Sequence, residues 1–387
     1  MKFSCSTTDL LQALQLVSRA ISGQQALPIL SNVLIAAEGK RCTVSATDLE
    51  LSIITSFEAA IENEGSITIP SKAILNFAQY NSDPEVLLET VEGTQLRCTS
   101  LHGKTLLSGE LASEYPAIVP VEKKTSFKLD AASLLEALHL VTFASARSSL
   151  RPVLSGVYLR TEGGKLVLVS TDSYRLSEYS ITTETDGDIS CIIPVKVLEE
   201  LKMILAAKKP AKRTSTEEGE KEGERIEAMP VQITLSQQQI EMQIGSVHLL
   251  SRLIEGKFPD YRQIIPKEHA LKALIDVREL TTAVKRMHYF AKEVNNSLTF
   301  SLRSADVHIA TPQTQLGKDE ATIQAEVTGG EGKIALSSSY LLDFLGHISE
   351  SVAELRMSDS MHPAVFYLPG NENFLHLIMP LRMPEGA

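Results

Sequence analysis

The stretch LLQALQLV at residues 10–17 returns as LLEALHLV at residues 134–141, and this recurrence decides the fold. Three further landmarks keep the same offset of 124 residues: Leu30-Ser31 and Leu154-Ser155, Thr47-Asp48 and Thr171-Asp172, and Pro70 and Pro194. A constant offset over four separate landmarks indicates two copies of one domain that follow each other in the same register.

A third and more diverged copy follows these two. Its opening helix is restated by Asp276, Leu280, Ala283, Val284 and Met287, and its next strand by residues 298–302. IALSSSYLLDFL at 334–345 echoes ITIPSKAILNFA at 67–78 and CIIPVKVLEELK at 191–202. The sequence therefore predicts three tandem domains, which we place at residues 1–121, 125–269 and 270–387.

The composition is typical of an ordinary soluble globular protein. The 387 residues are 43% hydrophobic, which is enough to build several cores. No stretch approaches the ~20 consecutive apolar residues of a membrane span, and the N-terminus lacks a secretory signal pattern. We therefore expect a cytoplasmic protein with no membrane partner.

The four cysteines give no sign of a metal or redox site. They lie far apart in the sequence and each stands in a strand-like context: Cys5, Cys42, Cys98 and Cys191. Their spacing fits neither a zinc knuckle nor a redox pair. We expect them to be buried free thiols in a reducing compartment.

The hydrophobic periods of the first repeat predict its local structure. Residues 8–22 place Leu and Val side chains on one face of an amphipathic helix. Alternating segments predict strands, the segment SITIP leads into a second helix at 71–80, and Gly93 marks a hairpin turn. Each copy is therefore expected to be mostly antiparallel sheet with two helices on one face, an α+β fold.

The first two copies differ in length at one place. From Pro70 to Pro116 the first repeat takes 46 residues, whereas from Pro194 to Pro259 the second takes 65, an insertion of about 19. The extra residues lie in the charged segment 208–230, which has too little apolar content to order itself. We expect a flexible, solvated surface loop there, and a docking or regulatory tail is the alternative.

The sequence carries none of the common catalytic motifs. The chain has no Gly-rich phosphate loop, no HExxH motif, no nucleophile elbow, and no histidines with metal-ligand spacing. Asp48 and Asp172 occupy equivalent places in two repeats, and Thr-Asp before an alternating strand is typical of a turn capped by an Asx hydrogen bond. We therefore expect structural aspartates, no catalytic residue, no metal and no cofactor.

Six motifs spread along the whole chain then carry a family resemblance. These are LPILSNVLI (27–35), VSATDLELS (44–52), VSTDSYRLS (169–177), GKFPDYRQIIP (256–266), HLIMPLRM (376–383) and the opening MKF. Together they resemble the bacterial DNA polymerase III beta subunit, the replicative sliding clamp, and the two most specific are FPDYRQIIP and the terminal MPLRM.

This resemblance implies an assembly and a set of partners. It implies three DNA-clamp domains per chain, with antiparallel sheets outside and two helices per domain inside, and two chains closed head to tail into a homodimeric ring. The ring would encircle double-stranded DNA without regard to sequence, near the nucleoid during replication. It would tether the polymerase III alpha subunit as a processivity factor, and also bind the clamp loader, other polymerases, mismatch-repair proteins and ligase through short motifs.

The net charge of −11 is unusual for a protein that grips DNA through phosphate contacts. A ring avoids this difficulty if only the helix faces toward its bore are basic. Candidate residues on those faces are Arg19, Lys72, Lys196, Lys202, Lys285 and Arg286, and each is alternatively an ordinary solvated helix charge. Two loop residues of the family that contact DNA are replaced here by Gln24 and Ser148, and Arg147 and Arg151 could take over part of their role.

The resemblance also implies a peptide-binding pocket for partner motifs. Residues that match the family's pocket by identity are Leu154, Thr171, Arg175, Leu176, Pro259, Met379, Pro380 and Arg382. Those that match by apolar type are Ile264, Met361, Leu377 and Leu381. Three positions depart from the family: Ser173 replaces a glycine, Tyr174 a histidine and Gln263 an arginine. From the residues alone, HLIMPLRM would be a last strand packed into the third domain, although Met, Leu and Pro also make adaptable binding floors.

Two other function classes remain as alternatives. A metal-dependent DNA-processing enzyme subunit needs clustered acidic ligands, and metal-dependent activity of the pure protein would favour it. A repeat-built adhesin or structural protein would be expected to carry a signal peptide and exposed loops.

Overall fold

The structure is a computed structural model that describes residues 1–387 except 22, 24–26, 148–149, 186, 209–229 and 383–387. The predictions made for Gln24, for Ser148 and for most of the 208–230 insertion therefore lie outside the described residues. The chain forms two compact units. The first comprises residues 1–131 with 210–253, and the second comprises residues 132–209 with 254–387.

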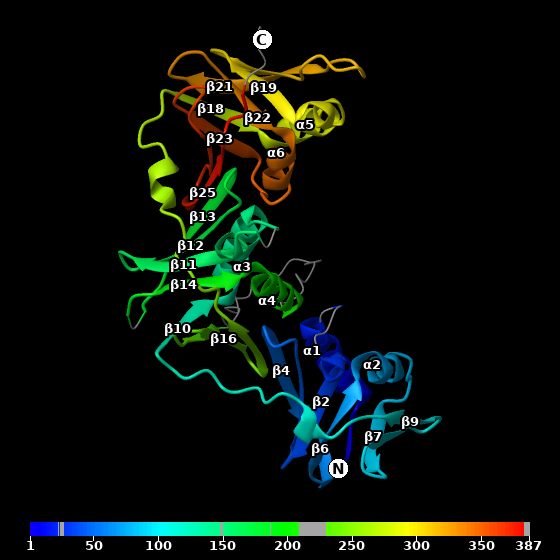
Figure 1. Cartoon of the computed structure of the whole chain (residues 1–387). Coiled ribbons are helices and arrows are strands. Elements are labelled where there is room, and N and C mark those ends of the chain that lie inside the picture. The colour runs from blue at the N-terminus through cyan, green and yellow to red at the C-terminus, as the bar shows by residue number, and fades with distance from the viewer. Residues whose placement is uncertain (22, 24–26, 148–149, 186, 209–229, 383–387) are drawn as a thin grey trace, which may run out of the picture. The chain divides into compact units, whose positions relative to one another are not determined.

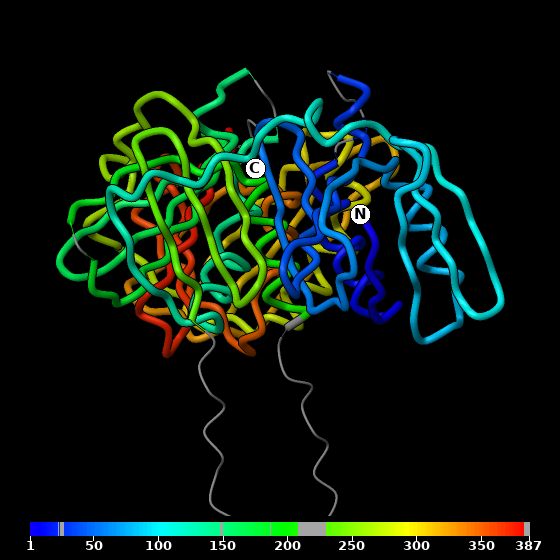
Figure 2. Tube along the Cα trace, turned by 90° about the horizontal axis from the view of Figure 1, so that it is seen from below, coloured from blue at the N-terminus to red at the C-terminus, as the bar shows by residue number. Residues whose placement is uncertain are grey.

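The first unit contains two antiparallel sheets. The smaller has the order β5-β1-β7-β8-β9, with bounds β5 (Ala60–Asn63), β1 (Lys2–Ser6), β7 (Glu85–Val91), β8 (Gln95–Thr99) and β9 (Lys104–Ser108). The larger runs β10 (Thr125–Asp130), β15 (Pro230–Leu235), β16 (Gln239–Ile244), β17 (Val247–Arg252), β4 (Leu51–Glu58), β3 (Arg41–Thr47), β2 (Asn32–Glu38) and β6 (Gly65–Pro70). Figure 2 shows the strands of 85–108, in cyan, as a layer distinct from the blue strands of 32–70.

The helices of this unit are α1 (Thr7–Val17) and α2 (Ser71–Gln79), which pack against each other. Ser6 begins α1 because its side chain accepts a hydrogen bond from the Asp9 N–H at 3.3 Å, which satisfies a free donor of the first turn. Leu10 and Leu14 of α1 are completely buried. Each such leucine stabilises the core by roughly 1.5 to 3 kcal/mol.

The second unit is built on one sheet of twelve strands. In spatial order these are β14 (Ser190–Pro194), β11 (Gly156–Glu162), β12 (Lys165–Thr171), β13 (Arg175–Thr182), β25 (Asn371–Ile378), β24 (Ala364–Leu368), β23 (Val352–Met357), β18 (Leu271–Asp276), β21 (Glu320–Thr328), β20 (Asp306–Ala310), β19 (Ser297–Leu302) and β22 (Gly332–Ser337).

The described part of this unit contains the helices α3 (Ala131–Val141), α4 (Val195–Lys208), α5 (Val277–Ala291) and α6 (Ser338–Leu345). Asp276 begins α5 by accepting the Glu279 N–H at 2.8 Å. Figure 1 shows α5 and α6 side by side, and they contact each other. Among the described residues, seven short 3-10 turns connect elements of both units: η1 (Ser18–Ala20), η2 (Pro28–Ser31), η3 (Ala112–Glu114), η4 (Thr142–Ala144), η5 (Pro152–Leu154), η6 (Tyr261–Ile264) and η7 (Lys292–Val294).

The predicted repeat is confirmed element by element. Strands β2, β3 and β4 begin at residues 32, 41 and 51, and β11, β12 and β13 begin at 156, 165 and 175, each 124 residues later. Helix α1 ends at Val17 and helix α3 ends at Val141, again 124 residues later. The turn at Gly93 is also confirmed, since this glycine has a φ of +78° between β7 and β8.

The sheets run across the predicted domain borders at two seams. Strand β4 of the first repeat pairs with β17 of the second, with Ser52 opposite Leu250. Strand β13 of the second repeat pairs in the same antiparallel way with β25 of the third, with Leu176 opposite Leu377. The second repeat is therefore divided between the two compact units, because each of its sheets continues that of a neighbour.

Some local predictions needed adjustment. The helix expected over 8–22 ends as α1 at Val17 and tightens into the 3-10 turn η1, while Cys191 is half-buried rather than buried like the other three cysteines. Burial raises the pKa of the Cys5, Cys98 and Cys191 thiols to about 12. In the part of the chain that the structure describes, no helix is long and apolar enough to cross a membrane.

Candidate functional site

A tight turn between β12 and β13 opens the candidate site. The Thr171 hydroxyl donates to the Arg175 carbonyl at 2.6 Å and accepts the Ser173 N–H at 3.1 Å. Asp172 Oδ1 accepts the N–H groups of Tyr174 and Arg175 at 2.9 and 3.0 Å. The turn forces Ser173 to a φ of +82°, a conformation that suits glycine best. The glycine that the family resemblance implies at this position would adopt this conformation without strain.

The same turn stands between β3 and β4 in the first repeat. The Thr47 hydroxyl donates to the Leu51 carbonyl, Asp48 Oδ1 accepts two backbone N–H groups, and Leu49 has a φ of +74°. The predicted structural role of Asp48 and Asp172 is therefore confirmed, since both carboxylates cap an Asx-type turn.

An apolar floor lies beside the turn of the second repeat. Leu154, Leu176 and Leu377 are buried in one cluster, and Met379 packs against it half-buried. The Met379 N–H donates to the Tyr174 carbonyl at 2.8 Å, which extends the seam between β13 and β25 by one more bond. Four residues predicted to share a pocket are thus brought together from the second and third repeats.

The segment 258–264 forms one rim of this floor. Phe258 and Tyr261 are buried in the same cluster, while Pro259 and Gln263 are exposed and Ile264 is 40% exposed. The aromatic pair therefore anchors the segment, and the residues between and after it remain available to a ligand.

Tyr261 is fixed by a polar network as well as by packing. Its hydroxyl donates to Glu178 of β13 and accepts hydrogen bonds from Arg160 of β11 at 2.8 and 3.1 Å. Arg160 also pairs with Glu162, which binds Arg262 in turn. Burial is the main cause that raises the pKa of Tyr261 well above its usual value, and the carboxylate of Glu178 adds to it. The phenol is therefore a neutral donor at all physiological pH values.

A second rim carries aromatic side chains. Tyr174 is largely exposed, and its ring lies nearly parallel to that of Tyr340, at 18° with centroids 6.4 Å apart. Sequence reasoning missed Tyr340. The available signal was a bulky aromatic in the third repeat at a place where the other two repeats carry Ala73 and Val197.

The remaining predicted pocket residues are less tightly placed. Pro380 and Leu381 are half-buried, and the Leu381 N–H donates to the Ala335 carbonyl at 2.8 Å. Arg382 is exposed. Met361 is 80% exposed on the loop between β23 and β24, outside the buried cluster.

The corresponding place at the other seam has different chemistry. There the Arg252 N–H donates to the Glu50 carbonyl at 3.2 Å. Arg252 therefore corresponds to Met379, and Glu50 corresponds to Tyr174. Ser52 takes the place of Leu176 in the strand pairing. The backbone arrangement is repeated, but the apolar floor belongs to the β13–β25 seam.

Several predicted DNA-facing residues are engaged within the protein. Arg286 holds Asp319 with two hydrogen bonds of 2.7 and 2.9 Å, and Lys202 pairs with Glu199 at 2.6 Å. Arg151 donates to Ser173 Oγ at 3.1 Å, so the structure places it at the turn of the candidate pocket.

The other basic candidates in the described part of the chain are all exposed: Arg19, Lys72, Arg147, Lys196 and Lys285. Lys72 and Lys196 lie on the second helix of their repeats and Lys285 on the first helix of the third repeat. Lys72 and Lys285 are therefore better placed for solvent-side contacts than Arg286 or Lys202.

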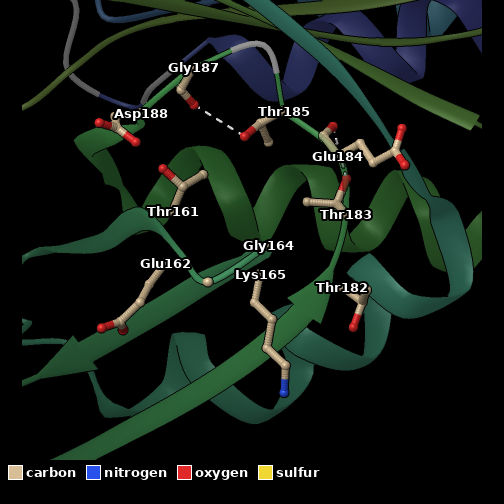
Figure 3. A pocket seen from close by; sticks show the side chains of 11 residues that line it. Thr161, Glu162, Gly164, Lys165, Thr182, Thr183, Glu184, Thr185, Gly187 and Asp188 are labelled. Atoms are coloured by element: carbon tan, nitrogen blue, oxygen red, sulfur yellow. Dashed lines mark hydrogen bonds between the residues drawn. The ribbon is translucent and has the colours of Figure 1, made fainter.

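Two further hollows lie on the surface of the described residues. One, of about 640 Å³, lies between the β11–β12 turn and residues 182–185, 187 and 188, and is lined by threonines, glycines and charged residues (Figure 3). None of the predicted site residues lines it. The other, of about 700 Å³, lies between α3 and α4 and is lined in part by Leu135, His139, Lys202 and Met203. Across the described residues, no three His, Cys, Asp or Glu side chains come close enough together to hold a metal ion.

Comparison with known proteins covers nearly the whole chain. Residues 1–119, 128–218 and 262–382 match the N-terminal, central and C-terminal domain models of the DNA polymerase III beta subunit. A beta sliding clamp from Synechocystis sp. is 28% identical over 406 residues, covering 99% of this chain and all of the relative.

Solved structures agree with these matches. The DNA polymerase sliding clamp from Bacillus subtilis superposes with a TM-score of 0.90 at 25% identity, over 99% of this chain and all of that one. The sliding clamp from Pseudomonas aeruginosa bound to griselimycin gives a TM-score of 0.88 at 26% identity, with the same coverage. The fold of this chain is therefore shared by solved sliding clamps over nearly its whole length.

Proposed function

The chain belongs to the family of the DNA polymerase III beta subunit, and on this premise we propose how it works as a sliding clamp. Two copies close head to tail into a ring around double-stranded DNA, and a pocket on each copy holds the polymerase. A clamp of this kind is a non-catalytic processivity factor. Its action rests on two surfaces, the contact between copies and the contact with partners.

The single observation that carries the ring is a pair of strand edges without a partner among the described residues. At both seams, the fourth strand of one repeat pairs with the last strand of the next. The equivalent fourth strand in the last repeat is β21, whose residues 320–324 pair with β20 alone, and the equivalent last strand in the first repeat is β9, at the edge of its sheet. If the edge of β21 in one copy pairs with that of β9 in another, as β13 pairs with β25, the copies join head to tail, and such contacts can close into a ring.

The repeat also predicts the register of the copy-to-copy seam. In the first repeat, Ser45 of β3 pairs with Ile54 of β4. In the third repeat, Ala310 of β20 occupies the place of Ser45 and pairs with Glu320 of β21. Glu320 therefore corresponds to Ile54. Lys104 of β9 stands where His248 stands in β17, and His248 pairs with Ile54. Lys104 of one copy should therefore lie opposite Glu320 of the other, and opposite charges on facing strands attract.

An apolar side chain supports the same edge. Leu106 is 55% exposed on β9, on the same side of the strand as Lys104. An exposed strand edge with an apolar side chain is a surface that pairs with another chain. The proposed seam would cover both features.

A charge exchange tests the seam. We expect Glu320→Lys to shift the dimer toward monomer in light scattering at micromolar concentration, because Lys104 then faces a like charge. The double variant Lys104→Glu/Glu320→Lys should restore the dimer. The matched control is Glu326→Lys, the same change on the half of β21 that already pairs with β18. A wild-type chain that is strictly monomeric would overturn the ring.

A ring explains how a chain of charge −11 retains DNA. Few basic residues can contact phosphates at once, so equilibrium binding to a free duplex should be weak and sensitive to salt. Protein loaded onto nicked circular DNA by a clamp loader should stay bound through gel filtration in high salt. It should leave once a restriction enzyme linearises the circle, and equal retention on linear DNA with free ends would contradict topological binding.

The floor formed by Leu154, Leu176, Leu377 and Met379 is the proposed site for partner motifs. We assign to it the remaining predicted pocket residues on its two rims and at the C-terminal segment. Two or three apolar anchors worth about 1.5 to 3 kcal/mol each, less the ordering cost, give micromolar binding. Such affinity lets the polymerase III alpha subunit, the clamp loader, other polymerases and repair proteins exchange on one site.

Two further assignments complete the proposal. We place the three clamp domains at residues 1–121, 125–269 and 270–387, and the match of three successive domain models supports their number. During replication the protein is associated with the nucleoid, because its ring is threaded on DNA. Imaging a fluorescent fusion before and after replication arrest tests this location.

A further inference from the structure

Arg175, a residue that the family resemblance places in the peptide pocket, is almost fully enclosed. Only 4% of it is exposed. Its Nε donates to Asp172 Oδ2 at 3.0 Å, and its Nη1 donates to Asp343 Oδ2 of α6 at 2.7 Å. The guanidinium therefore joins the turn of the second repeat to a helix of the third.

The flat faces of the same guanidinium are covered by aromatic rings. Its central carbon lies 4.8 Å from the Tyr340 ring centroid and 5.6 Å from that of Phe143. The N–H groups and the ring-stacking faces of an arginine are the parts that usually recognise a ligand. In Arg175, carboxylates and aromatic rings of the protein itself occupy them. A peptide in the pocket would have to displace these partners to reach it.

What Arg175 touches is instead the structure that shapes the pocket rim. Tyr340 faces the exposed ring of Tyr174, whose carbonyl accepts the Met379 N–H. Asp343 lies one helical turn after Tyr340 on α6, so the ion pair fixes that face of the helix. The contacts of one buried side chain thus set the relative places of Tyr174, Tyr340 and Met379.

We propose that Arg175 and Asp343 form a positioning pair, which holds the Tyr174–Tyr340 wall against the pocket floor without contacting the partner peptide. The peptide's apolar side chains then pack between that wall and Met379. This inference rests on the proposed partner pocket and assigns a role within it. It differs from a direct role for Arg175, in which the cation would bind a carboxylate of the partner.

The test compares two peptides on a set of variants by fluorescence anisotropy. The peptides share a core of Gln, Leu and Phe, and they differ in a single flanking Asp that is Asn in the second peptide. We expect Asp343→Asn and Arg175→Met each to weaken both peptides to the same extent, by about tenfold. The double variant should be no weaker than either single variant, because both remove one pair. Asp343→Glu, which keeps the carboxylate, should bind like the wild type.

A direct role for Arg175 gives different results. Arg175→Met would then weaken the Asp peptide alone, Asp343→Asn would leave both affinities unchanged, and the positioning role would be overturned. Retention of each variant on circular DNA shows that the ring is intact, so a folding defect is recognised separately. If the wild-type protein binds neither peptide, the pocket itself is misassigned, and that outcome is distinct from failure of the positioning pair.

Discussion

Asp48 and Asp172 hold their turns with the same two backbone hydrogen bonds. Asp48 Oδ1 accepts the N–H groups of Glu50 and Leu51 at 3.1 and 2.8 Å, and Asp172 Oδ1 accepts those of Tyr174 and Arg175 at 2.9 and 3.0 Å. Because the backbone is the same at both seams, a difference in binding between them must come from side chains. The first seam is therefore an internal control for the second.

Removing the carboxylate of Asp172 should destabilise the second repeat. Asp172→Ala loses two turn hydrogen bonds and the pairing with Arg175, and we expect a loss of about 2 kcal/mol in chemical denaturation. Asp172→Asn keeps an amide oxygen for the turn and should lose less. Equal losses for the two variants would show that the turn bonds contribute little.

A charge in the apolar floor should abolish partner binding. Met379→Asp places a carboxylate against the mainly apolar cluster that contains Leu176 and Leu377, and removing a charge from water in such surroundings is unfavourable. We expect no measurable binding of a short peptide containing Gln, Leu and Phe by anisotropy. The matched control is Arg252→Asp at the equivalent place of the first seam, which should bind normally. Unchanged affinity in Met379→Asp would mean that the pocket lies elsewhere.

The exposed lysines and the paired arginine should differ in their contribution to DNA binding. If Lys72 or Lys285 contacts a phosphate, its change to alanine should lower the slope of log affinity against log salt by about 0.9. Arg286→Ala should leave the slope unchanged, because Arg286 already binds Asp319. Duplex binding titrated over a range of salt concentrations measures both effects, and a lower slope in Arg286→Ala would show that the ion pair opens on DNA.

Stability should fall in mild acid because of His376. This side chain is fully buried at the second seam, with Nδ1 paired to Ser177 Oγ at 2.8 Å. Burial, assisted by the positive charge of Arg175 and by His347, holds its pKa well below the ordinary value of 6.5. Below pH 6.5 this histidine therefore becomes protonated in the unfolded chain but stays neutral in the folded chain. This group's contribution is present above pH 6.5 and is lost as the pH falls further, by up to about 1.4 kcal/mol per pH unit.

The variant His376→Asn isolates that effect. Asn can still bond Ser177, but it does not titrate, so the slope of stability between pH 6.5 and 5 should be shallower than in the wild type. The other histidines with lowered pKa values, His139, His269 and His288, act in the same direction and remain in both proteins. Identical slopes would show that His376 is not responsible.

Sequence reasoning reached the repeats because their pattern is local and periodic. The equal offsets of β2 to β4 and β11 to β13 follow from Leu30-Ser31 and Thr47-Asp48, whose spacing the chain preserves. The Asx turns follow in the same way, since an aspartate and the two N–H groups that it binds are neighbours in sequence. Such features need no knowledge of distant contacts.

The seams and the pocket rims could not be predicted from local sequence patterns. Arg175 and Asp343 are 168 residues apart, and no local pattern connects them. Arg151 was expected to face DNA because the sequence shows its charge but does not show its hydrogen-bond partner, Ser173. Long-range partners decide whether a charged side chain serves a ligand or the fold, and a single sequence does not show them.

The seam between β13 and β25 has a mechanical consequence. Its two strands belong to one chain, so a broken ladder re-forms at the high local concentration that the covalent connection maintains. The seam proposed between Lys104 and Glu320 has no such tether, because its strands belong to different molecules. Dilution or a pulling force would therefore separate the assembly at the seam between copies first. DNA would enter the ring through that seam, while the seams inside each chain stay closed.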